Sequence, residues 1–108
     1  ATATDHELAK AALERLDVLQ YFDFIFTCYD AGVGKNTPEF FLKVLELLNT
    51  PKGETVVFED ALHAIKSAKA AGLSVVAVYD KSSREKLEEI KAIADIYLDS
   101  FEDWEMIL

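Results

Sequence analysis

Apolar positions follow helical spacing in some stretches of the chain and form short continuous runs in others. Residues 5–17 repeat apolar positions every three to four residues, and Asp5 is placed to cap a helix there. The aromatic and β-branched run 22–30, "FDFIFTCYD", is typical of a short strand. A glycine-containing loop follows and leads to Pro38, which fits the first turn of a second helix.

Beyond this second helix, apolar runs and helical stripes alternate regularly. The run at 74–79 is so continuously apolar that both faces of the strand it predicts should be covered. The aromatic tail should dock on the core. In chain order we expect a helix carrying Phe41, Val44, Leu45 and Leu48, a strand at 55–58, a helix at 61–71 closed by Gly72, a strand at 74–79, a helical stripe through Leu87, Ile90 and Ile93, a short run "ADIYLDS", and a tail with Phe101 and Trp104.

This alternation of strands and helices predicts an α/β fold. Strand–helix–strand units favour a parallel sheet with helices on both faces, which is a three-layer α/β/α, Rossmann-like arrangement. A chain of 108 residues has the length of one domain and is too short for two independent cores. We therefore expect a single domain over residues 1–108.

Charge and cysteine content narrow the function classes. The net charge of −9, without a cluster of basic residues, disfavours nucleic acid and anionic membranes as partners. The longest apolar stretches are far shorter than the ~20 residues of a membrane-spanning helix, and we expect a cytoplasmic protein. Cys28 is the sole cysteine, which excludes a disulfide framework and favours a buried thiol over a reactive nucleophile.

Chemically useful side chains follow the predicted strands, because ligands of open parallel sheets bind beyond the carboxyl ends of the strands. Glu59 and Asp60 come directly after an apolar run. Asp60 either caps the next helix, with Glu59 solvated, or the two carboxylates hold a hard cation such as Mg²⁺. Lys35 is either a surface lysine or a phosphate ligand. Its loop lacks the glycine and hydroxyl pattern of a P-loop.

Together, the stretches "ATATD", "GVGKNTPEFF" and "VVFEDALHAIKSAKAAGLSVVAVYD" resemble the second, third and fourth motifs of the haloacid dehalogenase superfamily. The branch is the one that includes β-phosphoglucomutase and phosphoglycolate phosphatase, and the resemblance covers essentially the whole chain. The most specific parts are the lysine in a "GKxxPxxF" frame and "FED" followed by "AxxAG".

The resemblance implies Mg²⁺-assisted phosphoryl transfer through an aspartyl phosphate, acting on a small phosphorylated metabolite. Thr2 would hydrogen-bond a phosphoryl oxygen, and Lys35 would neutralise charge between nucleophile and phosphate. Glu59 and Asp60 would hold the Mg²⁺ ion. These roles suit phosphoryl transfer, because its transition state spreads negative charge over oxygens that need fixed cations and donors.

Several positions depart from the family pattern, and one departure is serious. The first motif, an Asp-x-Asp pair that supplies the nucleophile and the general acid/base, is absent from the sequence, as is the cap domain. The resemblance therefore implies the C-terminal portion of a core domain, with an incomplete sheet. Because native proteins cover or pair their strand edges, we expect one of three outcomes. The chain binds a missing N-terminal segment, self-associates through its edges, or pairs "FDFIFTC" with "TVVFE".

Three functions stay open at this point. The first is a fragment of a Mg²⁺-dependent phosphatase, with a phosphomutase as the less favoured variant. The second is a non-catalytic α/β module that binds a partner or regulates one, having lost the nucleophile. A receiver-like signalling domain is the third, and it is disfavoured because Lys35 precedes the acid pair instead of following it.

Overall fold

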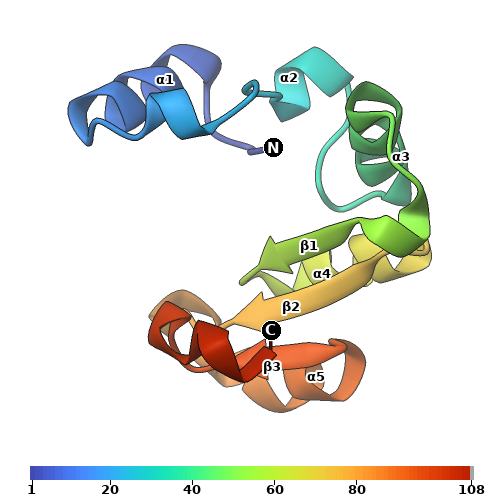
Figure 1. Cartoon of the computed structure of the whole chain (residues 1–108). Helices are drawn as coiled ribbons and strands as arrows, with labels where there is room; N and C mark the ends of the chain where they lie inside the picture. The colour runs from blue at the N-terminus through green and yellow to red at the C-terminus, as the bar shows by residue number, and fades with distance from the viewer. Residues whose placement is uncertain (108) are drawn as a thin grey trace.

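The computed structural model describes residues 1–107, which form two parts joined by one helix (Figure 1). The N-terminal part, residues 1–32, is called the N-terminal arm. Residues 55–98 form the sheet unit, and helix α3 connects the two. The elements are α1 (His6–Arg15), η1 (Leu19–Tyr21), α2 (Cys28–Ala31), α3 (Pro38–Leu48), η2 (Lys52–Glu54), β1 (Val56–Glu59), α4 (Leu62–Ala70), β2 (Ser74–Val78), η3 (Lys81–Lys86), α5 (Leu87–Ile93), β3 (Ile96–Leu98) and η4 (Phe101–Ile107).

The sheet unit contains a parallel sheet whose strand order, β1-β2-β3, is the order of the chain. Val57 lies opposite Val75, and Ala77 lies opposite Tyr97. The prediction of an α/β fold with a parallel sheet is confirmed. The bounds of β1 and β2 differ by at most one residue from those expected, and β3 lies inside the short run 94–100. Helices connect the strands because parallel pairing requires a crossover from one end of the sheet to the other.

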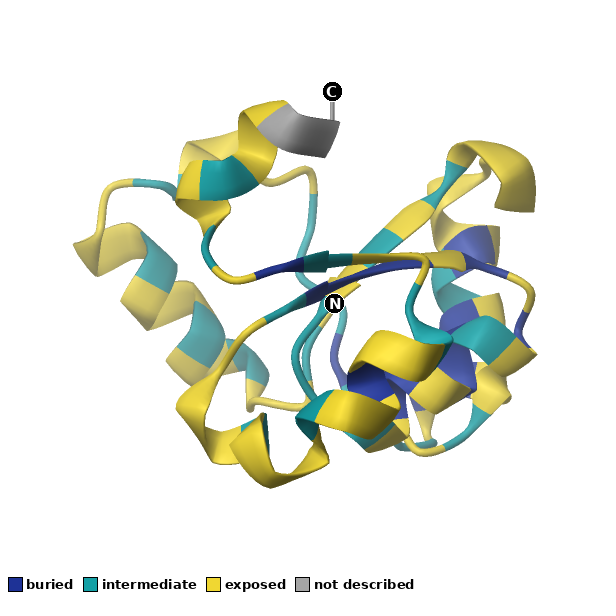
Figure 2. Cartoon of the chain, turned by 90° about the horizontal axis from the view of Figure 1, so that it is seen from below, coloured by how far each residue is buried: buried dark blue, intermediate teal, exposed yellow. Residues whose placement is uncertain are grey.

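One face of the sheet is packed against α4 and α5, and this face holds the core (Figure 2). Ile65 of α4, Val75 and Ala77 of β2, and Ile90 of α5 are buried together. Val75, Val76 and Ala77 are all at most 3% exposed, so the expectation that both faces of this strand are covered is confirmed. Gly72 ends the helix before β2 with a φ of 92°, a conformation that favours glycine.

The tail covers part of the opposite face of the sheet, where Val56 stays 51% exposed. Trp104 and Phe101 of η4 contact the ring of Phe58, with centroid separations of 5.2 and 6.2 Å. The predicted docking of the tail is therefore confirmed, although Phe101 stays 62% exposed. Within residues 1–107, the 3₁₀ helix η4 alone forms the third layer of the expected three-layer arrangement.

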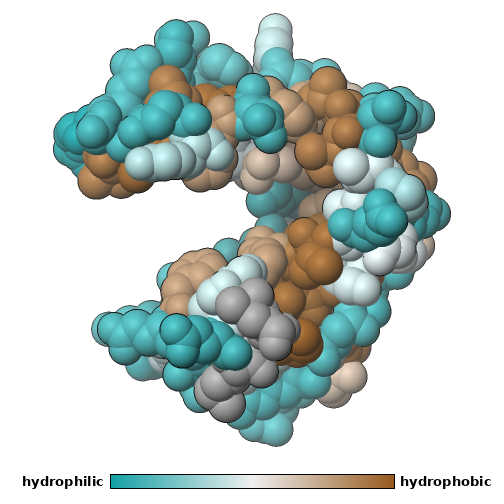
Figure 3. Space-filling model, in the orientation of Figure 1, coloured by the Kyte–Doolittle hydropathy of each residue, from teal (hydrophilic) through white to brown (hydrophobic). Residues whose placement is uncertain are grey.

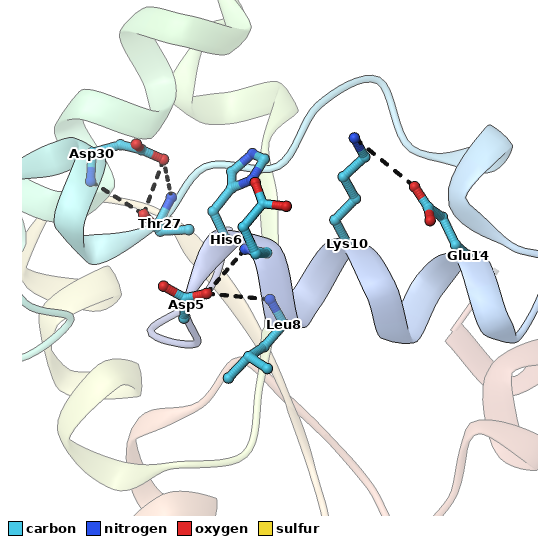
Figure 4. A network of polar contacts seen from close by, with 8 residues as sticks. Asp5, His6, Leu8, Lys10, Glu14, Thr27 and Asp30 are labelled. Atoms are coloured by element: carbon cyan, nitrogen blue, oxygen red, sulfur yellow. Dashed lines mark hydrogen bonds and ion pairs between the residues drawn. The ribbon is translucent and has the colours of Figure 1, made fainter.

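The N-terminal arm has very little interior. Helix α1 has no buried residue, and Leu8 is 66% exposed. The expected cap is present: the Asp5 side chain accepts hydrogen bonds from the backbone N–H groups of Glu7 and Leu8 (Figure 4). The helix therefore forms where the sequence predicts it, but on local interactions.

The predicted strand at 22–30 is wrong. Residues 22–26 belong to no helix or strand, and Thr27 forms a single parallel bridge with Thr2. The bridge consists of the bonds Thr2 N–H to Phe26 O and Cys28 N–H to Thr2 O. The segment does not pair with β1, which rules out the expected closure of the gap by "FDFIFTC". A strand requires a continuous neighbour, and here the Thr2 segment offers one residue.

Helix α3 begins at Pro38, as expected, and packs against both parts. Phe40, Phe41 and Leu45 are buried, whereas Leu48 is 38% exposed. The ring of Phe40 stacks on Phe26 of the arm and lies edge-on to Phe41. Among residues 1–107, no helix is long and apolar enough to cross a membrane.

Candidate active site

Glu59 is the last residue of β1, and its carboxylate is almost enclosed. Oε1 accepts hydrogen bonds from the N–H groups of Asp60, at 3.0 Å, and Ala61, at 3.3 Å. Oε2 accepts a hydrogen bond from Lys35 Nζ at 3.0 Å. Both oxygens are therefore engaged, one with the start of α4 and the other with the loop before α3.

Lys35 reaches Glu59 from a loop far away in sequence. The two side chains are 18% and 9% exposed, which makes their ion pair the least exposed one among the described residues. The loop that carries Lys35 is closed by Thr37, whose hydroxyl and N–H both donate to the carbonyl of Gly34, at 3.0 and 3.3 Å. Lys35 is thus not a solvated surface lysine, which corrects that interpretation.

The pKa values of the two acids are shifted in opposite directions. Burial alone raises the pKa of Glu59, but hydrogen bonds from Asp60 and Lys35 and the charge of Lys35 bring it below its ordinary value. The pKa of Asp60 is raised, first by burial and then by the neighbouring Glu59 carboxylate, with a smaller effect from Asp80. An additional cation beside Asp60 would relieve this repulsion.

The interpretation of Asp60 as a helix cap is wrong. The residue at the N-cap of α4 is Ala61, and no side chain caps this helix. Glu59 instead accepts the N–H groups of Asp60 and Ala61, the two residues before α4, because its side chain turns back over the chain at the end of β1. Glu59 is therefore not solvated, and no hydrogen bond to the Asp60 carboxylate is found in the described part of the chain.

Ala1, the neighbour of Thr2, lies across a hollow from this group. A cavity of about 200 Å³ is lined by Ala1 on the arm, by Lys35 and Glu59, and by apolar side chains of α3 and β1. The hollow opens between the two parts of the molecule (Figure 3). Thr2 follows Ala1, and its hydroxyl accepts a hydrogen bond from the N–H of Thr4 at 3.0 Å. The structure thus joins Lys35, Glu59 and Asp60 directly, whereas Thr2 is next to the lining residue Ala1 but does not line the cavity itself.

A second cavity adjoins the acid pair at the carboxyl ends of β1 and β2. It has a volume of about 260 Å³ and is lined by Glu59 and Asp60, by Asp80 and Tyr79 after β2, and by aromatic side chains. Asp80 accepts hydrogen bonds from the N–H and hydroxyl of Ser82, so it caps η3. The sequence marks this stretch by its place after a strand.

The donors suit a magnesium ion in part. Magnesium takes one or two carboxylates and keeps several water or phosphate ligands, so Glu59 and Asp60 match the carboxylate part of such a site. Within residues 1–107, no group of three or more acidic, histidine or cysteine side chains is arranged to hold a metal.

Cys28 is half-buried at the first residue of α2 and packs against the core, in the manner of a small apolar side chain. The helix it begins is closed by a capping box, in which the Thr27 hydroxyl and the Asp30 carboxylate each accept a backbone N–H of the other (Figure 4). This box fixes the residues that bridge to Thr2.

An α/β fold with two acids at the end of a strand and a lysine bonded to one of them is typical of phosphoryl-transfer enzymes, and the comparison with known families agrees with this class. The model of the haloacid dehalogenase-like hydrolases matches residues 1–72. The chain belongs to this family.

Relatives of this chain include several phosphatases. It is 36% identical over 96 residues to the phosphorylated carbohydrates phosphatase of Thermotoga maritima, covering 87% of this chain and 44% of that protein. It is 34% identical over 97 residues to the validoxylamine A 7'-phosphate phosphatase of Streptomyces hygroscopicus, covering 90% and 44%. The chain thus spans less than half the length of these curated relatives.

Solved structures agree on the fold. A Thermotoga maritima protein described as a candidate β-phosphoglucomutase superposes with a TM-score of 0.78 and 30% identity, over 98% of this chain and 50% of that one. A haloacid dehalogenase-like protein of Agrobacterium tumefaciens gives a TM-score of 0.79 at 22% identity, over 97% and 50%. The second likeness concerns the fold alone.

Proposed function

We propose that the complete protein is a phosphatase that hydrolyses phosphate esters of small metabolites, with sugar phosphates as the first class to test. The observation that carries this proposal is the enclosed pair of Lys35 and Glu59, 3.0 Å apart, beside Asp60 at the carboxyl end of β1. The names of the relatives favour hydrolysis over phosphoryl transfer between two positions of a sugar.

Each candidate residue has a role that its surroundings support. Lys35 supplies positive charge where the phosphoryl oxygens gather, in an otherwise acidic protein. The Thr2 hydroxyl, next to Ala1 at the edge of the cavity, donates to one of these oxygens in the proposal. Glu59 and Asp60 hold Mg²⁺, with Asp60 the more accessible ligand because both Glu59 oxygens already accept hydrogen bonds. When bound, the ion neutralises negative charge on the phosphate.

The nucleophile comes from another segment in this proposal. Residues 1–108 form the C-terminal portion of a core domain, and an aspartate outside them forms the aspartyl phosphate. Two observations support this arrangement. The outer edge of β1 pairs with no described strand, and the cavity beside it is lined by apolar side chains of α3 and β1 and by Lys35. A strand in this hollow would end beside Lys35.

Intact mass and N-terminal sequencing of the protein from its source cell test this part. A longer product with an Asp-x-Asp pair ahead of Ala1 is the expected result. A product that starts at Ala1 would contradict it and would leave self-association through the β1 edge, measured by light scattering, as the way the edge is covered.

The activity itself is tested on that complete protein. Phosphate release from a panel of sugar phosphates is measured with Mg²⁺ and with EDTA, for the parent and for Lys35→Met, Asp60→Asn and Lys66→Met. We expect hydrolysis that requires Mg²⁺, a loss of at least ~100-fold in the first two variants, and parent-like rates for Lys66→Met, whose pair with Glu89 is exposed. Absence of hydrolysis across the panel would favour the non-catalytic binding module.

Magnesium binding gives a second readout that is independent of turnover. Isothermal titration of the complete protein with MgCl₂ is expected to show one site that Asp60→Ala abolishes. Retention of parent-like binding in Asp60→Ala would overturn the assignment of this carboxylate as a ligand.

A further inference from the structure

The loop that carries Lys35 lies between two helices of very different length. Helix α3 has eleven residues, but α2 has four and ends at Ala31. A helix of four residues has few internal hydrogen bonds, so its last carbonyl groups need partners from elsewhere. Gly32, with a φ of 74°, turns the chain out of α2 toward Lys35.

Lys43 supplies such a partner from α3. Its Nζ donates a hydrogen bond of 2.7 Å to the carbonyl oxygen of Ala31, a residue that is 4% exposed. The ammonium group also lies 3.8 Å from Glu39, one turn earlier on the same helix. A cation at a helix C-terminus satisfies an unpaired carbonyl and interacts favourably with the helix dipole.

The contact closes the loop between two fixed points. Residues 32–37 start at the carbonyl that Lys43 holds and end at Thr37, immediately before α3. Within the loop, Thr37 is bonded to Gly34, and Lys35 is bonded to Glu59. Without the Lys43 contact, the start of the loop would be held only by the four-residue helix and by the packing of Ala31 and Val33 against the core.

We propose that Lys43 is a positioning residue for Lys35: by tying the end of α2 to α3, it fixes the loop that directs the Lys35 ammonium group to Glu59. Lys43 itself contacts neither acid of the site. For its effect on catalysis, the inference rests on the proposed function, in which Lys35 binds the phosphoryl group. The expected effect of Lys43 on the Lys35–Glu59 pair does not depend on the proposed function.

The experiment compares Lys43→Met, Lys43→Arg and Lys66→Met in the complete protein. The first readout is the ¹⁵N–¹H signal of the Lys35 ammonium group, whose hydrogen exchange is slowed by its bond to Glu59. We expect Lys43→Met to shift and broaden this signal, and Lys43→Arg and Lys66→Met to leave it in place. Arginine retains a donor for the Ala31 carbonyl, and Lys66 lies on the exposed side of α4.

The second readout is kcat/KM for the best phosphate ester of the panel. Lys43→Met is expected to lower it about 5- to 20-fold, Lys43→Arg to stay within about twofold, and Lys43→Met to add nothing in a Lys35→Met background. An unchanged Lys35 signal in Lys43→Met would overturn the proposal, as would an equal loss in both backgrounds. A disturbed signal in a protein that hydrolyses no phosphate ester would uphold the positioning role and refute the proposed function.

Discussion

The N-terminal arm and the sheet unit are both regular in backbone but differ in what stabilises them. In the arm, only Thr27 and Ala31 are buried, and its helices start at side-chain caps from Asp5 and Thr27. In the sheet unit, α4 and α5 bury apolar side chains against β2. Local hydrogen bonds therefore define the arm, whereas long-range apolar contacts define the sheet unit, and mutations should have different effects in the two.

The largest expected difference between the two parts is in the loss of stability when an aliphatic side chain is truncated. Ile65 is 0% exposed in α4, and Leu8 is 66% exposed in α1. We expect Ile65→Ala to lower the free energy of unfolding by about 2–5 kcal/mol and Leu8→Ala by less than about 0.5 kcal/mol, both measured by urea denaturation. Equal losses would show that a partner buries α1 in solution and would end the contrast.

The second-largest loss of stability should come from breaking the Lys35–Glu59 ion pair, which joins the loop 32–37 to β1. Lys35→Met leaves the enclosed Glu59 carboxylate with its two backbone donors but without a cation. We expect a loss of about 1–3 kcal/mol in the same denaturation experiment. Lys66→Met serves as the control, because its pair with Glu89 is more than half exposed on both sides and should contribute at most about 0.5 kcal/mol. A loss no larger than the control's would contradict the prediction.

A smaller and strictly local effect is expected from the cap of α1. Asp5→Ala removes the acceptor for the N–H groups of Glu7 and Leu8, which costs about 1 kcal/mol of helix stability. Hydrogen exchange should become faster for the amides of α1 and stay unchanged for those of β2. Faster exchange in β2 would mean that the arm and the sheet unit unfold together.

The smallest expected effect is a pH dependence in the acid range. A hydrogen bond from Lys69, followed by one from the Val75 N–H, lowers the pKa of Asp95 below its ordinary value. A carboxylate with a lowered pKa stabilises the fold above its unfolded value, about 3.9, and this contribution disappears as pH falls through the folded value. Asp95→Asn should therefore cost less than about 1 kcal/mol at pH 7.

The same comparison at lower pH completes this prediction. The difference between Asp95→Asn and the parent should shrink as the pH is lowered below about 4. In the arm, hydrogen bonds from the Thr27 backbone and hydroxyl lower the pKa of Asp30, and its contribution has the same sign. A difference for Asp95→Asn that stays constant down to pH 2 would show that the ion pair with Lys69 does not form in solution.

Sequence patterns predicted most of the fold because they are local. The Asp5 cap, Pro38 at the start of α3 and the apolar run of β2 each specify an element by themselves. The prediction of a strand at 22–30 was wrong because a strand depends on a distant partner as well as on local sequence. The aromatic residues of this run suit a strand, but the single bridge to Thr2 does not supply a neighbouring strand.

The candidate site was predictable in its members but not in its contacts. The end of a strand and the family resemblance point to Glu59 and Asp60. Lys35 follows α2 in the structure, so for Lys35, as for Thr2, the resemblance is the signal that remains. The sequence does not indicate that Glu59, instead of Asp60, accepts the N–H groups at the start of α4, because that depends on how the side chain turns at the end of β1. Lys43 carries no sequence signature, since its partner is a backbone carbonyl twelve positions away.

The chain-order sheet also bears on how the protein folds. Each strand pairs with the next strand along the chain across one helical crossover, so the sheet unit has a low contact order for a parallel sheet. Its nucleus should form early, around α4 and β2, where the fully buried side chains meet. The arm offers little apolar area to reward early docking, so its attachment to the preformed sheet should be the last and most reversible folding event.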